Sequence, residues 1–154
     1  MAVVFIGIGS NLGDRNDNLL RATGYISERA GKIISKSAIY ETEPWGFNAD
    51  TAFLNMVVEI TTELDPASLL EKLFEIERNM GRVRAGTGYR SRTIDLDILF
   101  YDNLVFETEE LVIPHPLLHK RRFVLDPLND IAPDFVHPVL RKTLQQLRND
   151  LKEE

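Results

Sequence analysis

The sequence contains no cysteine, and this absence excludes several kinds of site at once. Disulfide scaffolds, thiolate zinc sites and cysteine nucleophiles all need a thiol. A membrane helix needs ~20 apolar residues, and the longest apolar runs here are short ones such as residues 3–6. Met1 is followed directly by that run without a basic segment, so no signal peptide is expected. We therefore expect a soluble, cytoplasmic protein, although a chain without cysteine fits any compartment.

The length predicts a single domain that spans residues 1–154. A chain of this size buries roughly 70% of the surface that its unfolded form exposes, which is enough for a substantial core. Hydrophobic residues make up 44% of the sequence and charged residues 27%, close to the average for globular proteins. This composition excludes collagen-like, coiled-coil and wholly disordered chains.

Positive charge is scarce in total but concentrated in two segments. The formal net charge is −6, which argues against bulk attraction to nucleic acid or to an anionic membrane. Residues 78–94 contain five arginines and no acidic residue, and residues 119–122 read His-Lys-Arg-Arg. A solvated basic surface is one explanation. A pocket for a compact polyanion is the other, because guanidinium groups match phosphate oxygens in a bidentate way.

The order of the predicted elements is β-α-β-β-α-β. Strands are expected at 3–8, 32–42, 53–64 and 93–101, and helices at 14–29 and 65–81. This is the ferredoxin-like order, which predicts an α+β fold with an antiparallel sheet and both helices on one face. A turn at 102–103 is expected to return the chain as a hairpin arm at 104–106. Five prolines then divide the C-terminal third into short helices and turns, which should cover the other face or the edge in α/β/α layers.

The segment 92–98 reads Arg-Thr-Ile-Asp-Leu-Asp-Ile and is the most informative part of the chain. Residues two apart on a strand share a face, so Asp95 and Asp97 should project together while their neighbours turn inward. Magnesium prefers one or two carboxylates together with water and substrate phosphates. An ordinary strand with an acidic solvent face would carry the same pair. The adjacent arginines favour a metal site, because metal and arginine are complementary ligands for a polyphosphate.

Two other patterns have both a structural and a functional interpretation. Glu77 interrupts the apolar stripe of the second helix, so it either pairs with a nearby arginine or accepts hydrogen bonds from a substrate. Gly7, Gly9 and Gly13 follow a strand and precede a helix, but the third glycine comes one residue too late for a dinucleotide-binding loop. We expect these glycines to shape a tight turn into the first helix.

Aromatic and amide residues form a looser set. Phe53 and Asn55 share one strand face, so a ring and a hydrogen-bonding edge could be recognised together. Core packing is the alternative for each aromatic residue of the set. His115 lies in a loop between two prolines, which favours a role other than core packing, such as a hydrogen bond to a phosphate.

At this point the sequence resembles the hydroxymethyl-dihydropterin pyrophosphokinases of folate biosynthesis. The resemblance is carried by motifs at residues 5–13, 81–84, 92–98, 114–116 and 121–125, and it extends over nearly the whole chain to about Pro138. It implies that a pyrophosphoryl group passes from ATP to the hydroxymethyl oxygen of 6-hydroxymethyl-7,8-dihydropterin, and that AMP is released.

The resemblance also implies roles for individual residues. The catalytic set would be Arg82, Arg92, Asp95 and Asp97. ATP would contact Glu77, Arg84, Ile98, His115 and Arg121. The pterin would contact Thr42, Trp45, Phe53, Asn55 and Phe123. Asp95 and Asp97 would hold two Mg²⁺ ions on the ATP phosphates, and the other partners would be small molecules, with no nucleic acid and no membrane.

The sequence departs from the family pattern at several places, among them Phe74 and residues 89–91. Phe74 stands where some members have a glutamine that helps to bind the nucleotide. Residues 89–91 read Tyr-Arg-Ser in place of the commoner Trp-Gly-Pro, which is expected to change the closing rate of the arginine loop.

Three other functions stay open. A different magnesium-dependent kinase would release ADP instead of AMP. A ferredoxin-like sheet can also bind single-stranded RNA, although the negative net charge and the absence of an RNA-binding motif argue against it. A regulatory domain without catalysis would bind a small ligand and would not depend on Asp95 or Asp97.

Overall fold

A computed structural model of the protein describes residues 1–42, 52–81 and 94–151. The strands are β1 (Ala2–Ser10), β2 (Lys32–Lys36), β3 (Tyr40–Thr42), β4 (Phe53–Thr62), β5 (Asp95–Tyr101), β6 (Phe106–Glu107) and β7 (Val112–Ile113). The helices are α1 (Arg15–Arg29), α2 (Pro66–Asn79), the short 3-10 helix η1 (Leu118–Lys120), α3 (Arg122–Ile131) and α4 (Leu144–Asp150). None of the helices in these ranges combines the length and the apolar character that crossing a membrane requires.

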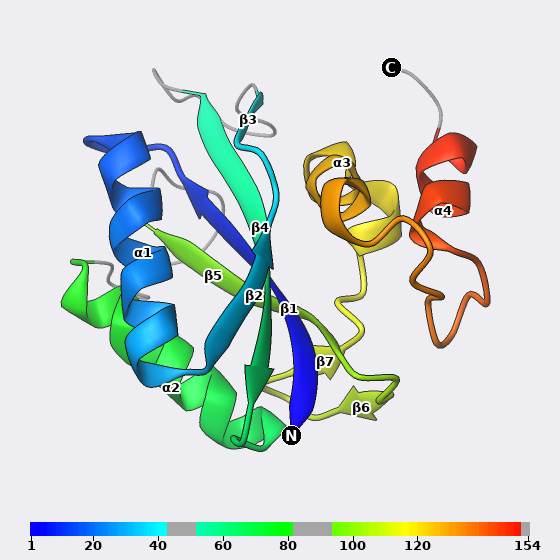
Figure 1. The fold of residues 1–154 in the computed structure, drawn as a ribbon, viewed down its shortest axis with the longest axis horizontal. Coiled ribbons are helices and arrows are strands. Elements are labelled where there is room, and N and C mark those ends of the chain that lie inside the picture. The colour runs from blue at the N-terminus through cyan, green and yellow to red at the C-terminus, as the bar shows by residue number, and fades with distance from the viewer. Residues whose placement is uncertain (43–51, 82–93, 152–154) are drawn as a thin grey trace.

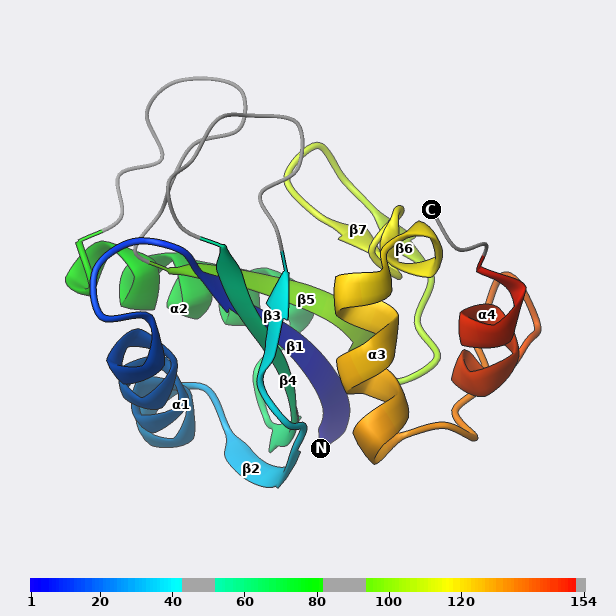
Figure 2. The ribbon, with the colours of Figure 1, turned by 90° about the horizontal axis from the view of Figure 1, so that it is seen from above.

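The centre of the fold is an antiparallel sheet in the order β2-β4-β1-β5, with β3 also paired to β4. Helices α1 and α2 lie on one side of this sheet and α3 on the other, with α4 beyond α3 (Figure 1). The view from above shows the same layers, with the sheet between the two groups of helices (Figure 2). The expected ferredoxin-like α+β fold is confirmed, and the C-terminal third covers the second face.

Side-chain alternation along the strands produces two separate cores. On β1, Val4, Ile6 and Ile8 face α1 and α2, while Phe5 faces the opposite side. The second core contains Phe100 and the buried leucines of η1, α3 and α4. Because both faces of the sheet bury apolar side chains, β1 and β4 are apolar along most of their length.

The helices begin where the sequence provides capping side chains. Asp14 and Asp65 each accept a hydrogen bond from the backbone N–H three residues later, and Pro66 occupies the first turn of α2. Thr143 and Gln146 form a reciprocal capping box at α4. The expected helices are therefore confirmed within a few residues at each end.

Four expectations need correction. The single strand expected at 32–42 is divided into β2 and β3, which pair separately with β4. The segment expected to return beside β5 instead pairs β6 with β7. Pro127 lies inside α3 and does not end it. Gly7 and Gly9 are extended residues of β1, and the turn before α1 uses Gly13, whose φ is +71°.

Candidate active site

The sheet surface that faces α3 carries a row of polar residues at one end, and we call this surface the site face. The register pairs Gly9 of β1 with Asn55 of β4 on one side and with Asp95 of β5 on the other. Residues directly opposite each other on neighbouring strands project from the same face. Asn55 and Asp95 therefore flank Gly9 at a backbone separation of roughly 10 Å, twice the usual strand spacing.

Gly9 determines where the Asn55 amide lies. A Cβ atom at position 9 would be only 2.8 Å from Asn55 Oδ1, so this oxygen occupies the space that a side chain would take. At Gly7 a Cβ atom would be 3.5 Å from the Leu99 side chain, which is an ordinary contact. A glycine inside a strand often marks such a close approach. The sequence shows Gly9 at the end of a strand-like run, but there it was interpreted as part of a turn.

Three of the residues expected to bind the pterin meet at one end of the site face. Asn55 Nδ2 donates a hydrogen bond to Thr42 Oγ1 at 3.0 Å, and Thr42 pairs with Phe53 across β3 and β4. Phe53 and Asn55 are both half-buried. Trp45 lies outside the described residues. An aromatic ring and an oriented amide thus stand side by side, as the alternation of β4 predicts.

Arg15 of α1 contacts β3 and the residue that precedes β4, and no pattern in the sequence singled it out. Its Nη1 donates to Glu41 Oε2 at 2.9 Å and to the backbone oxygen of Ala52 at 2.7 Å. Glu41 precedes Thr42, and Ala52 precedes Phe53. One guanidinium therefore links α1 to β3 and to the start of β4.

Asp95 and Asp97 lie on β5, and both are partly exposed on the site face as the alternation predicts. Between and beyond them, Leu96 and Ile98 are buried against α1 and α2. Ile98 is 3% exposed as a whole residue, so its side chain and its backbone offer little surface to a ligand.

Glu77 holds β5 from the side of α2. It is 1% exposed, and its Oε2 accepts a hydrogen bond from the backbone N–H of Leu96 at 2.8 Å. Leu96 lies between Asp95 and Asp97, so the carboxylate of Glu77 fixes the strand that presents the two aspartates. A nearby arginine or a substrate was the partner expected for Glu77 from the sequence, and the backbone N–H of Leu96 was not foreseen.

His115 and Arg121 lie beside Asp95. The His115 backbone N–H donates to the carbonyl of Leu99 on β5, and its Nδ1 accepts from the Leu117 N–H at 3.3 Å. Burial lowers the pKa of His115, the Arg121 guanidinium lowers it further, and the Asp95 carboxylate opposes both. These three groups are therefore close enough to interact electrostatically.

Phe123 begins α3 next to Arg121, whose guanidinium carbon is 5.6 Å from the centre of the ring. This distance is within the range of a cation–π contact. Both residues are partly exposed. The expected residues Arg82, Arg84 and Arg92 lie outside the described residues.

The two aspartates suit magnesium better than a metal that needs a full protein cage. Within residues 1–42, 52–81 and 94–151, no three His, Asp or Glu side chains converge on a common point. Magnesium typically takes one or two carboxylates and completes its shell with water and phosphate oxygens. The donor set of Asp95 and Asp97 therefore fits a magnesium–polyphosphate complex.

Comparison with known proteins gives a consistent result. Residues 5–133 match the model of the 7,8-dihydro-6-hydroxymethylpterin-pyrophosphokinase (HPPK) family. A 2-amino-4-hydroxy-6-hydroxymethyldihydropteridine pyrophosphokinase of Porphyromonas gingivalis is 43% identical over 141 residues, which cover 90% of this chain and 95% of that protein. The enzyme of the same name from Aquifex aeolicus is 40% identical, with 99% and 95% covered.

Larger proteins contain a similar region. The folic acid synthesis protein FOL1 of Dictyostelium discoideum is 40% identical over 97% of this chain, which spans 22% of that protein. The crystal structure of Plasmodium falciparum HPPK-DHPS with pteroate has a TM-score of 0.78 at 21% identity and covers 96% of this chain and 42% of that one. This structural likeness shows the fold, and the sequence matches show more: the chain belongs to the 7,8-dihydro-6-hydroxymethylpterin-pyrophosphokinase family.

Proposed function

We propose that residues 1–154 form one pyrophosphokinase domain that uses the site face to transfer pyrophosphate from ATP to 6-hydroxymethyl-7,8-dihydropterin. The products are the pterin diphosphate and AMP. Family membership supports this reaction, and one observation on the structure carries it: Asn55 and Asp95 flank Gly9 on a single face. Asn55, which can recognise a heterocycle, and Asp95, which can hold a metal–polyphosphate, therefore lie on one face with a backbone separation of roughly 10 Å.

The pterin would lie at the end of the site face where β3 and β4 meet. The Asn55 amide can donate to and accept from the edge of the heterocycle, with Thr42 holding its orientation. Phe123 and Phe53 would contact the two faces of the ring, because flat aromatic ligands stack on aromatic side chains. Trp45 completes the proposed set.

The ATP phosphates would lie at the β5 end, where Asp95 and Asp97 would hold two Mg²⁺ ions. Magnesium supplies charge neutralisation and orientation of the phosphates in reactions of this kind. Arg121 and His115 would contact phosphate oxygens. Since His115 Nδ1 accepts from Leu117, its other nitrogen carries the proton in the neutral ring and donates toward the substrate.

Other residues of the proposed set act on the nucleotide and on the developing charge. Arg84 and Ile98 would contact the nucleotide, and Glu77, which is buried against the Leu96 N–H, would act on it through β5. Arg82 and Arg92 would neutralise charge on the phosphates during transfer.

The reaction needs positioning more than covalent chemistry from the protein. The hydroxymethyl oxygen bonds to the β-phosphorus, the bond from this phosphorus to the α,β-bridging oxygen breaks, and AMP leaves with that oxygen. The hydroxyl proton is released to phosphate or solvent. We therefore propose that no side chain acts as an obligatory strong base. A site variant that removes one proton acceptor, keeps metal binding and abolishes turnover would contradict this part.

The deciding experiment supplies ATP, magnesium and 6-hydroxymethyl-7,8-dihydropterin and identifies the nucleotide product. AMP formed in step with pterin diphosphate is the expected result. Asp95→Asn and Asp97→Asn should each lower turnover by roughly 10²–10³-fold, as the loss of a single stabilising group does in other active sites.

Asp102→Asn is the matched control, since it makes the same chemical change just beyond the end of β5. Asp102 has a φ of 48° and accepts from the Val3 N–H, and asparagine tolerates that conformation and keeps an acceptor. Its activity should stay near that of the unaltered protein. Release of ADP would replace the proposed reaction with a simple kinase reaction, and no turnover at all would indicate a binding protein.

A further inference from the structure

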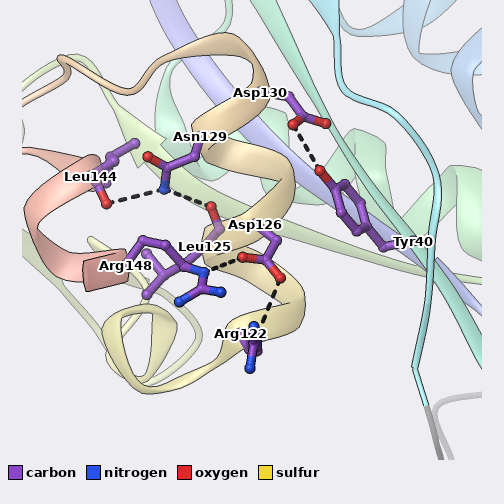
Figure 3. Close-up of polar contacts among 8 residues, drawn as sticks. All are labelled: Tyr40, Arg122, Leu125, Asp126, Asn129, Asp130, Leu144 and Arg148. Atoms are coloured by element: carbon purple, nitrogen blue, oxygen red, sulfur yellow. Dashed lines mark hydrogen bonds and ion pairs between the residues drawn. The ribbon is translucent and has the colours of Figure 1, made fainter. Parts of the chain in front are cut away.

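One carboxylate connects helix α3 to the segment that leads into β3. Tyr40 Oη donates a hydrogen bond to Asp130 Oδ1 at 2.7 Å, and the backbone N–H of Ala38 donates to Asp130 Oδ2 at 3.0 Å. Figure 3 shows the Asp130 side chain extending from α3 toward the Tyr40 hydroxyl. Each oxygen of Asp130 thus has a donor from residues 38–40.

Tyr40 lies next to the residues assigned to the pterin. The β3–β4 register places Tyr40 directly opposite Asn55, so the two side chains project from the same face. Thr42 is two residues further along β3 and lies on that face too, where it accepts from Asn55 Nδ2. The position of Tyr40 therefore sets the position of Thr42 and, through it, of the Asn55 amide.

Asp130 has a comparable relation to Phe123. The two residues are seven apart on α3, a spacing that places them on the same side of a helix. A bond from Asp130 to β3 therefore fixes the side of α3 that also carries Phe123. The separation between Phe123 and the Thr42–Asn55 pair depends on this connection.

The connection joins a charged acceptor to two donors, which makes it stronger than a hydrogen bond between neutral groups. The hydrogen bond to Asp130, helped by burial, raises the pKa of Tyr40 to about 12. The hydroxyl therefore stays protonated and continues to donate throughout the physiological pH range.

Helix α3 is also held by α4, through contacts of Asp126 and Asn129. Arg148 Nε pairs with Asp126, which also forms an i,i+4 ion pair with Arg122. Asn129 Nδ2 donates to the backbone oxygens of Leu125 and Leu144 (Figure 3). Removing the Arg148 contact loosens α3 from α4 and leaves its bond to β3 intact.

We propose that Asp130 and Tyr40 are positioning residues for the pterin, which act by fixing α3 and β3 at the separation that a flat ring requires. The inference rests on the proposed function, because it uses the pterin roles of Thr42, Asn55 and Phe123. It adds two residues that do not themselves contact the substrate.

The test compares Tyr40→Phe, Asp130→Ala and the double variant with Arg148→Ala as the control. Steady-state rates are measured with the pterin and ATP varied in turn, and thermal unfolding is recorded for each protein. Asp130→Ala should raise the KM for the pterin roughly tenfold, the scale of one charge-assisted hydrogen bond. Tyr40→Phe should raise it less, because Ala38 still donates to Asp130. The KM for ATP should change less than about twofold in both, within the spread of distant surface changes.

The double variant shows whether the two substitutions act through the same Tyr40–Asp130 hydrogen bond. Once Asp130 is absent, the Tyr40 hydroxyl has lost its acceptor, so Tyr40→Phe should add nothing further to the KM for the pterin. Arg148→Ala should lower the melting temperature and leave the KM for the pterin unchanged.

Several outcomes overturn the inference. If Arg148→Ala raises the KM for the pterin as much as Asp130→Ala does, general loosening of α3 is responsible. If Tyr40→Phe and Asp130→Ala leave the KM for the pterin unchanged while the unaltered protein turns over, the bridge has no positioning role. If the unaltered protein neither turns over nor binds the pterin, the proposed function itself fails and the inference fails with it.

Discussion

At the scale of the residue, the absence of a side chain at Gly9 lets the Asn55 side chain of the neighbouring strand β4 lie over β1. Asn55 Oδ1 occupies the position that a side chain at residue 9 would fill, and a Cβ atom there would approach it to 2.8 Å. Asn55 Nδ2 at the same time donates to Thr42. The orientation of the amide thus depends on the hydrogen bond of its nitrogen to Thr42 and on the space that Gly9 leaves for its oxygen.

Gly9→Ala is therefore expected to move the Asn55 amide while it leaves the fold intact. The displaced atom is the end of a side chain and not backbone, so the free energy of unfolding should change by less than about 1 kcal/mol. The KM for the pterin should rise by roughly tenfold, the scale of a misplaced hydrogen bond. Kinetics with the pterin varied, together with urea denaturation, measure the two effects separately.

Gly7→Ala provides the comparison, because it makes the same change two residues earlier on β1. The new methyl group would contact Leu99 at an ordinary 3.5 Å and would not approach Asn55. Its KM for the pterin should match that of the unaltered protein. Equal kinetic effects of the two alanines would contradict the role assigned to Gly9.

Single residues differ in how far the sequence alone could place them. The spacing of Asp95 and Asp97 was sufficient, because strand alternation depends only on position in the chain. The bridge between Tyr40 and Asp130 was not accessible in this way. It joins residues 90 apart, and their proximity follows from how α3 packs on the sheet.

At the scale of the element, β5 is held to α2 by a buried carboxylate. Glu77 accepts from the Leu96 N–H, and Leu96 separates the two aspartates of the site. A buried N–H that loses its acceptor costs about 1–3 kcal/mol, and a replacement that keeps an acceptor avoids this cost. The polar residue that interrupts the apolar stripe of α2 thus serves the neighbouring strand.

Glu77→Ala should lower the free energy of unfolding by about 1–3 kcal/mol, the cost of an unsatisfied buried donor. Glu77→Gln retains an oxygen that can accept from Leu96 and should lose less stability. Glu75→Ala is the control on the same helix: Glu75 is partly exposed and pairs with Arg29 and Lys72 at 3.7 and 3.6 Å. Such surface pairs contribute little. Urea denaturation without substrates distinguishes the three, and equal losses in the two alanine variants would contradict the role of Glu77.

The elements themselves were predictable where local signals are strong. Asp14, Asp65 and Thr143 mark helix starts because an N-cap satisfies free backbone N–H groups within three residues. Strand partners are a different matter. Nothing local distinguishes a return beside β5 from the pairing of β6 with β7, since both use the same short extended segment.

At the scale of the whole molecule, the C-terminal third completes the fold by covering the second face of the sheet. Phe100 of β5 meets Phe5 at a centroid distance of 6.1 Å and His137 at 5.4 Å, both edge-on. His137 is 4% exposed, and its Nδ1 accepts from the backbone N–H groups of Val139 and Leu140. The family match ends at residue 133, so this histidine lies beyond the matched region.

The stability of the molecule should therefore fall in mild acid. Burial lowers the pKa of His137 below its ordinary value of 6.5, and the nearby His119 lowers it further. The unfolded chain consequently binds more protons than the folded chain just below pH 6.5, so the free energy of unfolding rises with pH there. The stabilisation from the neutral ring is complete above pH 6.5 and is lost as the pH falls toward the lowered pKa. Protonation places a hydrogen on Nδ1 and removes the acceptor for both backbone groups.

Urea denaturation between pH 5 and pH 8 measures this dependence, with His137→Asn as the comparison. The asparagine oxygen can accept from the same backbone groups without titrating in this range, so the variant should lose stability less steeply in acid. His115 also has a lowered pKa and is present in both proteins, so a smaller slope should remain in the variant. Asparagine lacks the ring contact of His137 with Phe100, so the variant should be less stable near neutral pH. The two stability curves should approach each other as the pH falls. Parallel curves over the whole range would show that the C-terminal layer is held by its apolar contacts alone.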